Sequence, residues 1–360
     1  ASMSVTEVGS AASAPLRATV TLRHEQSPAD PLSGRQWYLD EINVAPVWRD
    51  FTGKGGRIGQ FEPGGGFAVA PEIFDIGHPD LKPNIDPIWL QTQRTNGTLP
   101  ALASNHATQV AGVMVGARND QGGIGIAYEA KIGGHYLANK GDDLTNLGQM
   151  VNYDIANNSW GFKTDFGLTN VPEGKVDTAL ALAFSTTLAA TNGRGGLGTI
   201  VVASGGNQRH KGGNAQGSLT NNNRHAIEVA AINAKADLSV LQAATAPFSN
   251  PGSSLLVAAP GSHVLSSGVS LEAERGASVG SAYSTTQGTS FAAPIVSGVV
   301  ALMLQANPGL GYRDVQQILA LSARKVDDAS TQWAYNAGRN WNGGGMHASH
   351  DYGFGMIDAR

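Results

Sequence analysis

Apolar residues along this chain gather into short runs that alternate with longer stretches of helical spacing. The short runs are rich in β-branched residues and bounded by Gly, Pro or Asn, which is typical of buried strands; they cover residues 57–62, 155–160, 199–204, 225–232 and 255–259. The longer stretches predict helices at residues 106–116, 144–151, 176–190, 295–307 and 314–323. Strands that alternate with helices predict an α/β domain with a mostly parallel central sheet and helices on both faces.

The predicted helix at residues 295–307 is apolar on almost every face and ends before Pro308, so we expect it at the centre of the domain. A glycine turn precedes it. Gly288 permits a sharp turn, and Ser290 follows at the helix start, where free N–H groups and the helix dipole favour a developing negative charge. This is a suitable position for a nucleophile, although a small serine packed at a crowded helix start would give the same pattern.

Two acidic residues are candidates for a partner of a catalytic base. Glu62 ends the strand at residues 57–62 and is followed by Pro63 and three glycines, and open α/β sheets keep their sites at the carboxyl ends of strands. Asp75 follows a stretch of apolar and small residues and is the alternative. Either carboxylate can accept a hydrogen bond from an imidazole N–H, and either can also be an ordinary solvated acid.

His106 stands near the start of the predicted helix at residues 106–116, after a polar turn. The positive end of the helix dipole disfavours a charged imidazolium. We therefore expect a neutral imidazole that can accept a proton near neutral pH.

Composition bounds the function classes. With 360 residues, 41% of them hydrophobic and 14% charged, the chain can bury a large core, and we expect one domain at residues 29–360 after an N-terminal tail, pro-segment remnant or engineered end at 1–28. A net charge of −4 gives no reason to expect nucleic acid, and no apolar run approaches the roughly 20 residues of a membrane span. Cysteine is absent, so a metal ion is the obvious alternative to a disulfide staple.

The residues from Gly288 to Pro294, Gly-Thr-Ser-Phe-Ala-Ala-Pro, resemble the nucleophile motif Gly-Thr-Ser-x-Ala-x-Pro of subtilisin-like serine peptidases. Residues 106–112 are similar to the family's His-Gly-Thr-His-Val-Ala-Gly, with Ala107 and Gln109 replacing the glycine and the second histidine. The run at residues 36–56 resembles the entry of the kexin/furin branch, and the order acid, His, Ser along the chain is that of subtilisin.

The resemblance covers roughly residues 30 to 360 and implies a three-layer subtilisin-like catalytic domain with serine endopeptidase activity. It implies that Ser290 is the nucleophile and His106 its base. Glu62 occupies the position of the family's catalytic Asp, with Asp75 in reserve. Asn207 in Ala-Ser-Gly-Gly-Asn matches the family's oxyanion donor only if the extra glycine bulges; otherwise it is an ordinary turn residue.

Substrate contacts also follow from the resemblance. The subtilase edge that pairs with substrate backbone, a form of strand addition, matches Ser159, Trp160 and Gly161. Kexin-like enzymes cleave after paired basic residues because acids line the pocket for the residue before the cut. The matching positions here are Thr164 and Gln216, with Asp165 just beside the pocket. Because these acids are missing, we expect a broad or apolar preference with no dibasic requirement.

The resemblance implies a calcium site formed by Asp30, Asp80 and the loop that begins at Asn119, where hard oxygen ligands from distant segments would suit Ca²⁺. It further implies a secreted or cell-surface location, polypeptide substrates, and a pro-segment or neighbouring domain of a longer precursor as partner. Two other functions stay open at this point: a subtilase-shaped binding or chaperone domain whose triad the Glu has spoiled, and an esterase using the same site.

Overall fold

The computed structural model describes residues 30–63, 72–100, 102–137, 143–161, 176–217, 222–233, 248–269, 282–326, 333–335 and 346–360. The proposed tail at 1–28 lies outside these residues, so the predicted division at residue 29 stays a prediction.

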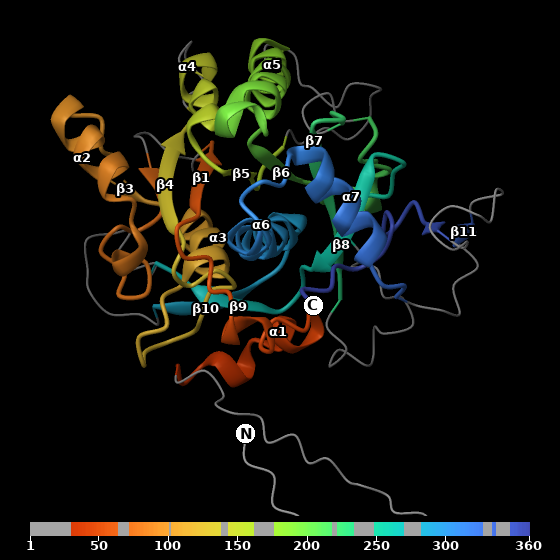
Figure 1. The fold of residues 1–360 in the computed structure, drawn as a ribbon, viewed down its shortest axis with the longest axis horizontal. Coiled ribbons are helices and arrows are strands. Elements are labelled where there is room, and N and C mark those ends of the chain that lie inside the picture. The colour runs from red at the N-terminus through yellow and green to blue at the C-terminus, as the bar shows by residue number, and fades with distance from the viewer. Residues whose placement is uncertain are drawn as a thin grey trace, which may run out of the picture.

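A six-stranded sheet runs through the middle of the molecule (Figure 1), with strand order β4-β1-β5-β6-β7-β8 and every neighbouring pair parallel. Because all strands run the same way, their carboxyl ends meet at one edge of the sheet. The strands are β1 (Arg57–Glu62), β4 (Lys131–Tyr136), β5 (Ile155–Asn158), β6 (Ile200–Ser204), β7 (Ala226–Ile232) and β8 (Leu255–Pro260).

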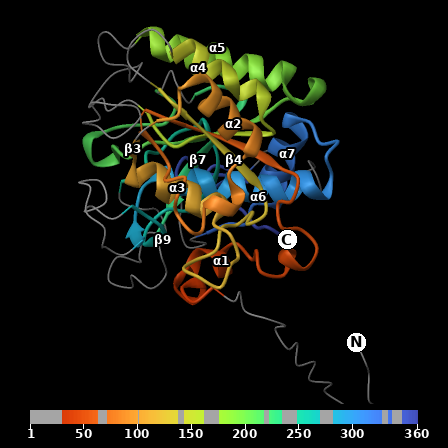
Figure 2. The ribbon, with the colours of Figure 1, turned by 90° about the vertical axis from the view of Figure 1, so that its left-hand side faces the viewer.

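Helices cover both faces of this sheet. The apolar helix α6 (Thr289–Ala306) packs against the central strands on one face, with α3 (Asn105–Val115) beside it. On the other face lie α4 (Asp143–Gly148) and α5 (Val176–Asn192), and the two views in Figures 1 and 2 both place this pair on the opposite side of the sheet from α3 and α6. The predicted three-layer α/β fold is therefore confirmed.

Side-chain burial follows the period of the strands. On β1, Ile58 belongs to the large core beneath α3 and α6, whereas Phe61 belongs to a second apolar cluster on the face of α4 and α5. Successive strand residues point to opposite faces, so Ile58, Gln60 and Glu62 share the face that α3 covers. This alternation sends the last residue of the strand toward the start of α3.

Smaller elements complete the domain. The other helices are α1 (Trp37–Glu41), α2 (Pro87–Asn96) and α7 (Tyr312–Ser322). Two-stranded sheets join β2 (Glu72–Ile73) to β3 (Leu102–Ala103), β9 (Val264–Ser267) to β10 (Tyr283–Thr286), and β11 (Ala334–Tyr335) to β12 (His347–Ala348). Short 3-10 helices cover Ser33–Arg35, Val47–Arg49, Lys82–Asn84, Gln149–Asn152, Gly193–Gly196 and Arg209–Lys211.

Helix α6 is long and apolar enough to cross a membrane, but 83% of it is buried inside the protein, as in the core helix of a folded domain. It ends with Asn307 as its C-terminal cap, directly before Pro308, as the sequence predicted. The sequence analysis did not foresee helix α2 or the antiparallel pair β9–β10. Helix α2 nevertheless carries local end signals, since Asp86 caps its first turn, Pro87 is its first residue and Gly97 ends it in the left-handed conformation. The β9–β10 pairing, in contrast, needs two separate segments to meet in the folded chain.

Candidate active site

Three side chains that the sequence singled out stand at strand and helix ends. Glu62 is the last residue of β1, His106 is the second residue of α3, and Ser290 is the second residue of α6. Helices α3 and α6 lie side by side on one face of the sheet (Figure 1). The ring of Phe291, the neighbour of Ser290, lies 5.4 Å from the His106 ring between centroids. The fold thus gathers these segments at one place.

The carboxylate of Glu62 faces the imidazole of His106. Oε2 of Glu62 lies 3.2 Å from Nδ1 of His106, and the Glu62 side chain is 5% exposed against 39% for His106. Burial alone would lower the pKa of His106, but the charge of Glu62 and this hydrogen bond raise the pKa above its ordinary value. The expectation of a neutral histidine from the helix dipole left out the charge of this carboxylate, which raises the pKa of His106.

Asp75, the alternative partner, is engaged elsewhere. Its Oδ1 accepts a hydrogen bond from the backbone N–H of Gly77 at 2.8 Å, and its own N–H donates to Oγ1 of Thr108 at 2.9 Å. This is a local turn in which the carboxylate binds the backbone two residues on. Glu62, and not Asp75, is therefore the acid that contacts His106 in this structure.

Ser290 sits just inside the start of α6. Gly288 caps the helix with φ 145° and ψ 156°, a backbone conformation that glycine adopts far more readily than other residues. The N–H of Ser290 lies in the first helical turn, where it has no intrahelical acceptor. No hydrogen bond joins Ser290 to His106 within the described part of the chain, and such contacts are commonly long before substrate binds.

The amide of Asn207 is fixed from one side. Its Oδ1 accepts hydrogen bonds from both the N–H and the Oγ1 hydroxyl of Thr289, each at 2.9 Å. Because a backbone N–H can only donate, the atom facing it is the oxygen, and the NH₂ group faces away. Gly206 takes φ 93°, and its N–H donates to Oγ1 of Thr289 at 3.1 Å. Gly206 therefore lies in the left-handed region that favours glycine, and Asn207 lies beside Thr289, the residue before Ser290.

The proposed substrate edge follows β5. Ser159 and Trp160 are buried and Gly161 is exposed, and the Trp160 indole packs in the cluster beneath α4 and α5. Of the proposed pocket positions, Thr164 and Asp165 lie outside the described residues. Gln216 is exposed, and its Oε1 accepts hydrogen bonds from the N–H and the hydroxyl of Ser253, both at 2.9 Å.

The proposed calcium ligands come together from three segments. Oδ1 of Asp30 accepts hydrogen bonds from the N–H groups of Asn119 at 3.0 Å and Gln121 at 3.1 Å, while its Oδ2 is buried without a partner among the described residues. Oδ1 of Asp80 accepts from Nδ2 of Asn119 at 3.4 Å and from the hydroxyl of Tyr283 at 3.1 Å. Burial raises the pKa of Asp80, and the nearby charge of Asp30 adds to that rise against the opposing effects of His78 and the hydrogen bonds.

Sequence reasoning missed three residues of this region. Gln60 contacts Glu62, Thr289 orients Asn207, and Tyr283 binds Asp80. Gln60 had a detectable signal, because a glutamine at the core-facing position of a buried strand is unusual. Tyr283 had none, since its contact spans 203 residues of sequence.

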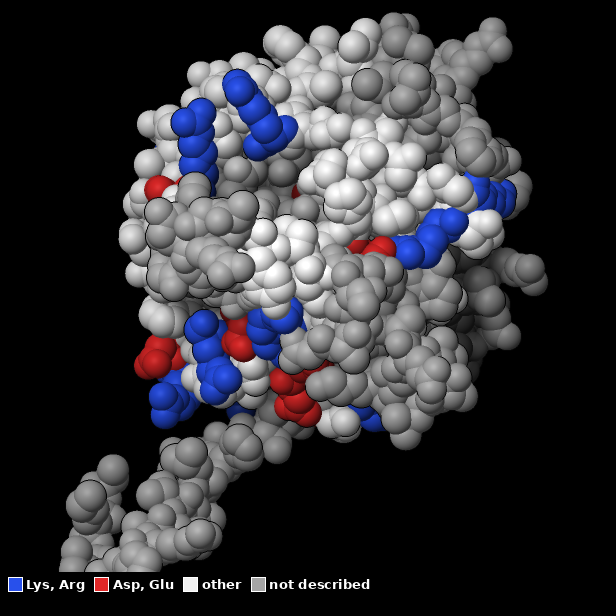
Figure 3. Space-filling model, turned by 90° about the vertical axis from the view of Figure 1, so that its right-hand side faces the viewer, with Lys and Arg blue, Asp and Glu red and all other residues white. Residues whose placement is uncertain are grey.

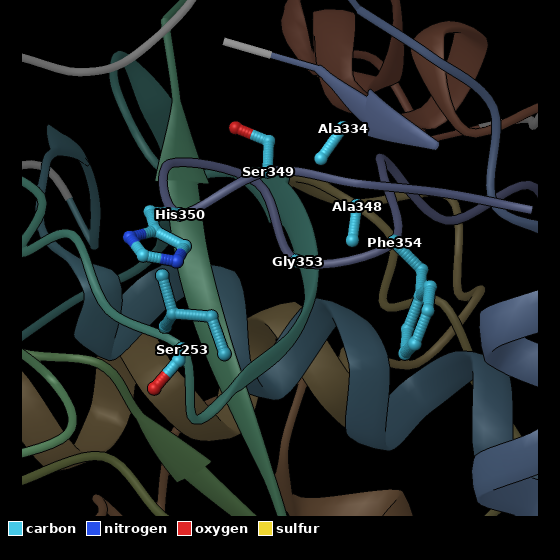
Figure 4. A pocket seen from close by; sticks show the side chains of 8 residues that line it. Ser253, Ala334, Ala348, Ser349, His350, Gly353 and Phe354 are labelled. Atoms are coloured by element: carbon cyan, nitrogen blue, oxygen red, sulfur yellow. The ribbon is translucent and has the colours of Figure 1, made fainter. Parts of the chain in front are cut away.

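A cavity of about 500 Å³ lies apart from this site, against the beginning of β8 at the opposite end of the strands (Figure 4). Its lining includes Ser253, His350 and Phe354 and none of the proposed site residues. On the face shown in Figure 3, basic and acidic side chains of the described residues are interspersed without a broad patch of one sign. The described charged residues on that face form no electrostatic footprint for a polyanion.

A serine at a helix start, a histidine paired with a carboxylate and a fixed asparagine amide are the parts of a serine hydrolase site. A profile of the Subtilase family matches residues 67–355, and the chain belongs to this family of serine peptidases. The matched region begins after Glu62.

Relatives agree with this assignment. The chain is 31% identical to kexin of Saccharomyces cerevisiae over 355 residues, which are 92% of this chain and 39% of kexin. It is 29% identical to rat (Rattus norvegicus) furin over 356 residues, 93% of this chain and 40% of furin. The chain therefore spans less than half the length of these two relatives.

Solved structures share the fold. The serine protease of Aeromonas sobria superposes with a TM-score of 0.71 at 22% identity, over 96% of this chain and 70% of that one. Fervidolysin of Fervidobacterium pennivorans gives a TM-score of 0.61 at 20% identity, over 96% of this chain and 48% of that one.

Proposed function

We propose that this protein is a serine endopeptidase that hydrolyses peptide bonds through Ser290, His106 and Glu62. The observation that carries the proposal is the 3.2 Å contact between Oε2 of Glu62 and Nδ1 of His106, formed beside the start of α6. A carboxylate on Nδ1 selects the tautomer whose Nε2 accepts a proton, which is the form that activates a serine hydroxyl.

In the proposed mechanism, Oγ of Ser290 attacks the carbonyl carbon of the scissile peptide while its proton passes to Nε2 of His106. Glu62 stabilises the imidazolium that forms. The N–H of Ser290 and Nδ2 of Asn207 donate hydrogen bonds to the oxyanion of the tetrahedral intermediate. His106 then donates the proton to the leaving amine, and a water molecule, deprotonated by His106, hydrolyses the acyl-enzyme.

We further propose a structural calcium site at Asp30, Asp80 and Asn119. The donor set fits a hard cation, since two buried carboxylates lie close together and Oδ2 of Asp30 has no partner within the described residues. No cluster of three or more His, Cys, Asp or Glu side chains suited to a metal occurs in that part of the chain, so carbonyl and amide oxygens must complete the shell. A bound ion would link segments distant in sequence, a stabilising role.

The proposed substrates are polypeptides, with a broad or apolar preference before the cut. The missing acids support this, because a buried guanidinium or ammonium without a counter-charge is strongly disfavoured. We propose a secreted or cell-surface location by analogy with the family, and a pro-segment or neighbouring domain as partner. In this regard, the Aeromonas sobria serine protease was crystallised in complex with a chaperone.

Fluorophosphonate labelling tests the proposed activity. We expect a covalent adduct on Ser290 that disappears in Ser290→Ala and falls sharply in His106→Ala, together with cleavage of a denatured protein substrate. A folded protein that never labels would overturn the proposal in favour of a binding domain. Ester turnover without any protein cleavage would point instead to an esterase.

A further inference from the structure

Gln60 is a polar residue buried beside the catalytic pair. It lies two residues before Glu62 on β1, is 1% exposed, and shares with Glu62 the face of the strand that α3 covers. Nε2 of Gln60 lies 2.9 Å from the carbonyl oxygen of Ala107 and 3.3 Å from Oε1 of Glu62. Gln60 therefore links the acid to the helix that carries His106.

The orientation of the Gln60 amide follows from chemistry. The carbonyl of Ala107 can only accept a hydrogen bond, so the atom facing it is the NH₂ group, which has two hydrogens. One hydrogen serves Ala107 and leaves the other for Glu62. The two oxygens of Glu62 then have different partners, since Oε1 accepts from Gln60 and Oε2 faces His106.

Burial of Gln60 has a disadvantage that needs an explanation. Its Oε1 is buried without a hydrogen-bond partner among the described residues. A buried polar atom in this state destabilises the folded protein, and an apolar side chain would avoid it. The two hydrogen bonds of the NH₂ group are the compensating feature, and one of them ends on the carboxylate.

Glu62 needs such support more than an aspartate would. Its side chain has one more methylene and one more rotatable bond, so its carboxylate can take up more orientations relative to His106. A hydrogen bond to one oxygen from a neighbour on the same strand removes much of that freedom. The hydrogen bond from the same NH₂ group to the carbonyl of Ala107 fixes the orientation of the amide, so that its other hydrogen points at Glu62.

We propose that Gln60 is a positioning residue that fixes the carboxylate of Glu62 against His106 and so allows a glutamate to serve in the triad. The inference rests on the proposed function and extends it. Gln60 does not contact the reacting atoms and acts through Glu62 alone.

A double-mutant cycle with Gln60→Met and Glu62→Gln tests the proposal, with cleavage of a chromogenic peptide as the assay. We expect Gln60→Met to lower kcat about 10- to 100-fold with KM changed less than roughly twofold, because a small misplacement of catalytic groups has effects of this order. In the Glu62→Gln background, Gln60→Met should change kcat less than about twofold, because the carboxylate that it positions is already gone.

Ser266→Ala is the matched control. The Ser266 hydroxyl donates to the carbonyl of Gln109 at 2.7 Å, another backbone carbonyl of α3, and does not touch Glu62. We expect this variant to retain kcat within about twofold, because catalytic positioning is untouched. Thermal unfolding shows whether each variant is folded. Gln60→Leu serves as a second apolar variant if Gln60→Met does not fold.

The possible outcomes distinguish a failure of the positioning role of Gln60 from a failure of Glu62 as the acid of the triad. An equal loss of kcat from Gln60→Met in both backgrounds, or no loss in either, would overturn the positioning role. A loss in Ser266→Ala equal to that in Gln60→Met would overturn it as well, because any disturbance of α3 would then suffice. Wild-type turnover in Glu62→Gln would instead reject Glu62 as the acid of the proposed function.

Discussion

Oε2 of Glu62 lies 3.2 Å from Nδ1 of His106, across 44 residues of sequence and between a strand end and a helix start. We propose that this contact places a glutamate where the family resemblance implies a catalytic aspartate. Gln60 donates a hydrogen bond to the other oxygen of Glu62, and this contact orients the longer side chain toward His106.

Replacement of Glu62 by glutamine should leave the fold intact and greatly reduce turnover. An amide at this position favours the wrong histidine tautomer, and the corresponding change in serine peptidase triads lowers kcat by about 10⁴-fold. Steady-state kinetics of Glu62→Gln and of the control Asp75→Asn will measure this. Near-wild-type activity in Glu62→Gln with a loss in Asp75→Asn would move the role to Asp75.

Asn207→Asp should abolish oxyanion stabilisation while it keeps the acceptor that Thr289 binds. The carboxylate retains an oxygen for the N–H and hydroxyl of Thr289 but offers no N–H to the oxyanion. We expect kcat to fall by about 10²- to 10³-fold with little change in KM, as when one oxyanion donor is removed. If Asn207→Asp and Asn207→Ala both turn over like the wild type, the donor is another group.

Calcium removal should lower the melting temperature. An ion that binds only the folded state at 100 times its dissociation constant stabilises by about 2.7 kcal/mol. We expect thermal unfolding to shift downward in excess chelator and to recover with Ca²⁺, and we expect Asp80→Asn to be insensitive to both. If the melting temperature of the wild type does not change in excess chelator, this result would contradict a calcium site at Asp30 and Asp80.

Stability should depend on pH through His135. This buried side chain stacks on Phe61 at 4.9 Å between ring centroids, its Nε2 lies 2.9 Å from the hydroxyl of Tyr153, and burial lowers its pKa to about 4. Between the ordinary pKa of about 6.5 and about 4, the unfolded chain binds a proton that the folded protein does not. The contribution of neutral His135 is thus complete above about pH 6.5 and is lost as pH falls, by up to roughly 3 kcal/mol.

Urea unfolding between pH 7 and pH 4 measures this effect. His135→Gln removes the titrating group and should flatten the fall of unfolding free energy with decreasing pH. His210→Gln, at an exposed histidine, is the control and should leave the slope unchanged. Identical slopes for wild type and His135→Gln would show that His135 does not carry the dependence.

Cleavage of a peptide library should show a broad or apolar preference at the residue before the scissile bond. The positions that we propose to match the acids of kexin-like pockets are Thr164 and Gln216, and neither carries a negative charge to pair with Arg or Lys. A strong signal for a basic residue would contradict this and direct attention to Asp165. Asp165→Asn would then be expected to remove that signal.

The sequence by itself determined five strands of the central sheet, the long helices that cover it, and the glycine turn before Ser290. A run of mostly apolar consecutive residues such as 200–204 predicts a buried strand by itself. The order Gly288, Thr289, Ser290 likewise places a serine at a helix start, because it depends only on backbone freedom and helix geometry. These features need no knowledge of distant segments. The three-layer fold followed from their alternation along the chain.

Only the tertiary structure decided which side chains meet. Glu62 and Asp75 were both credible from sequence, and the choice depended on where a strand end points relative to a helix that begins 44 residues later. The contact of Asn207 with Thr289, across 82 residues of sequence, likewise became visible only in the folded protein. Such contacts depend on packing between segments far apart in sequence, so no local pattern of hydrophobicity or backbone preference records them.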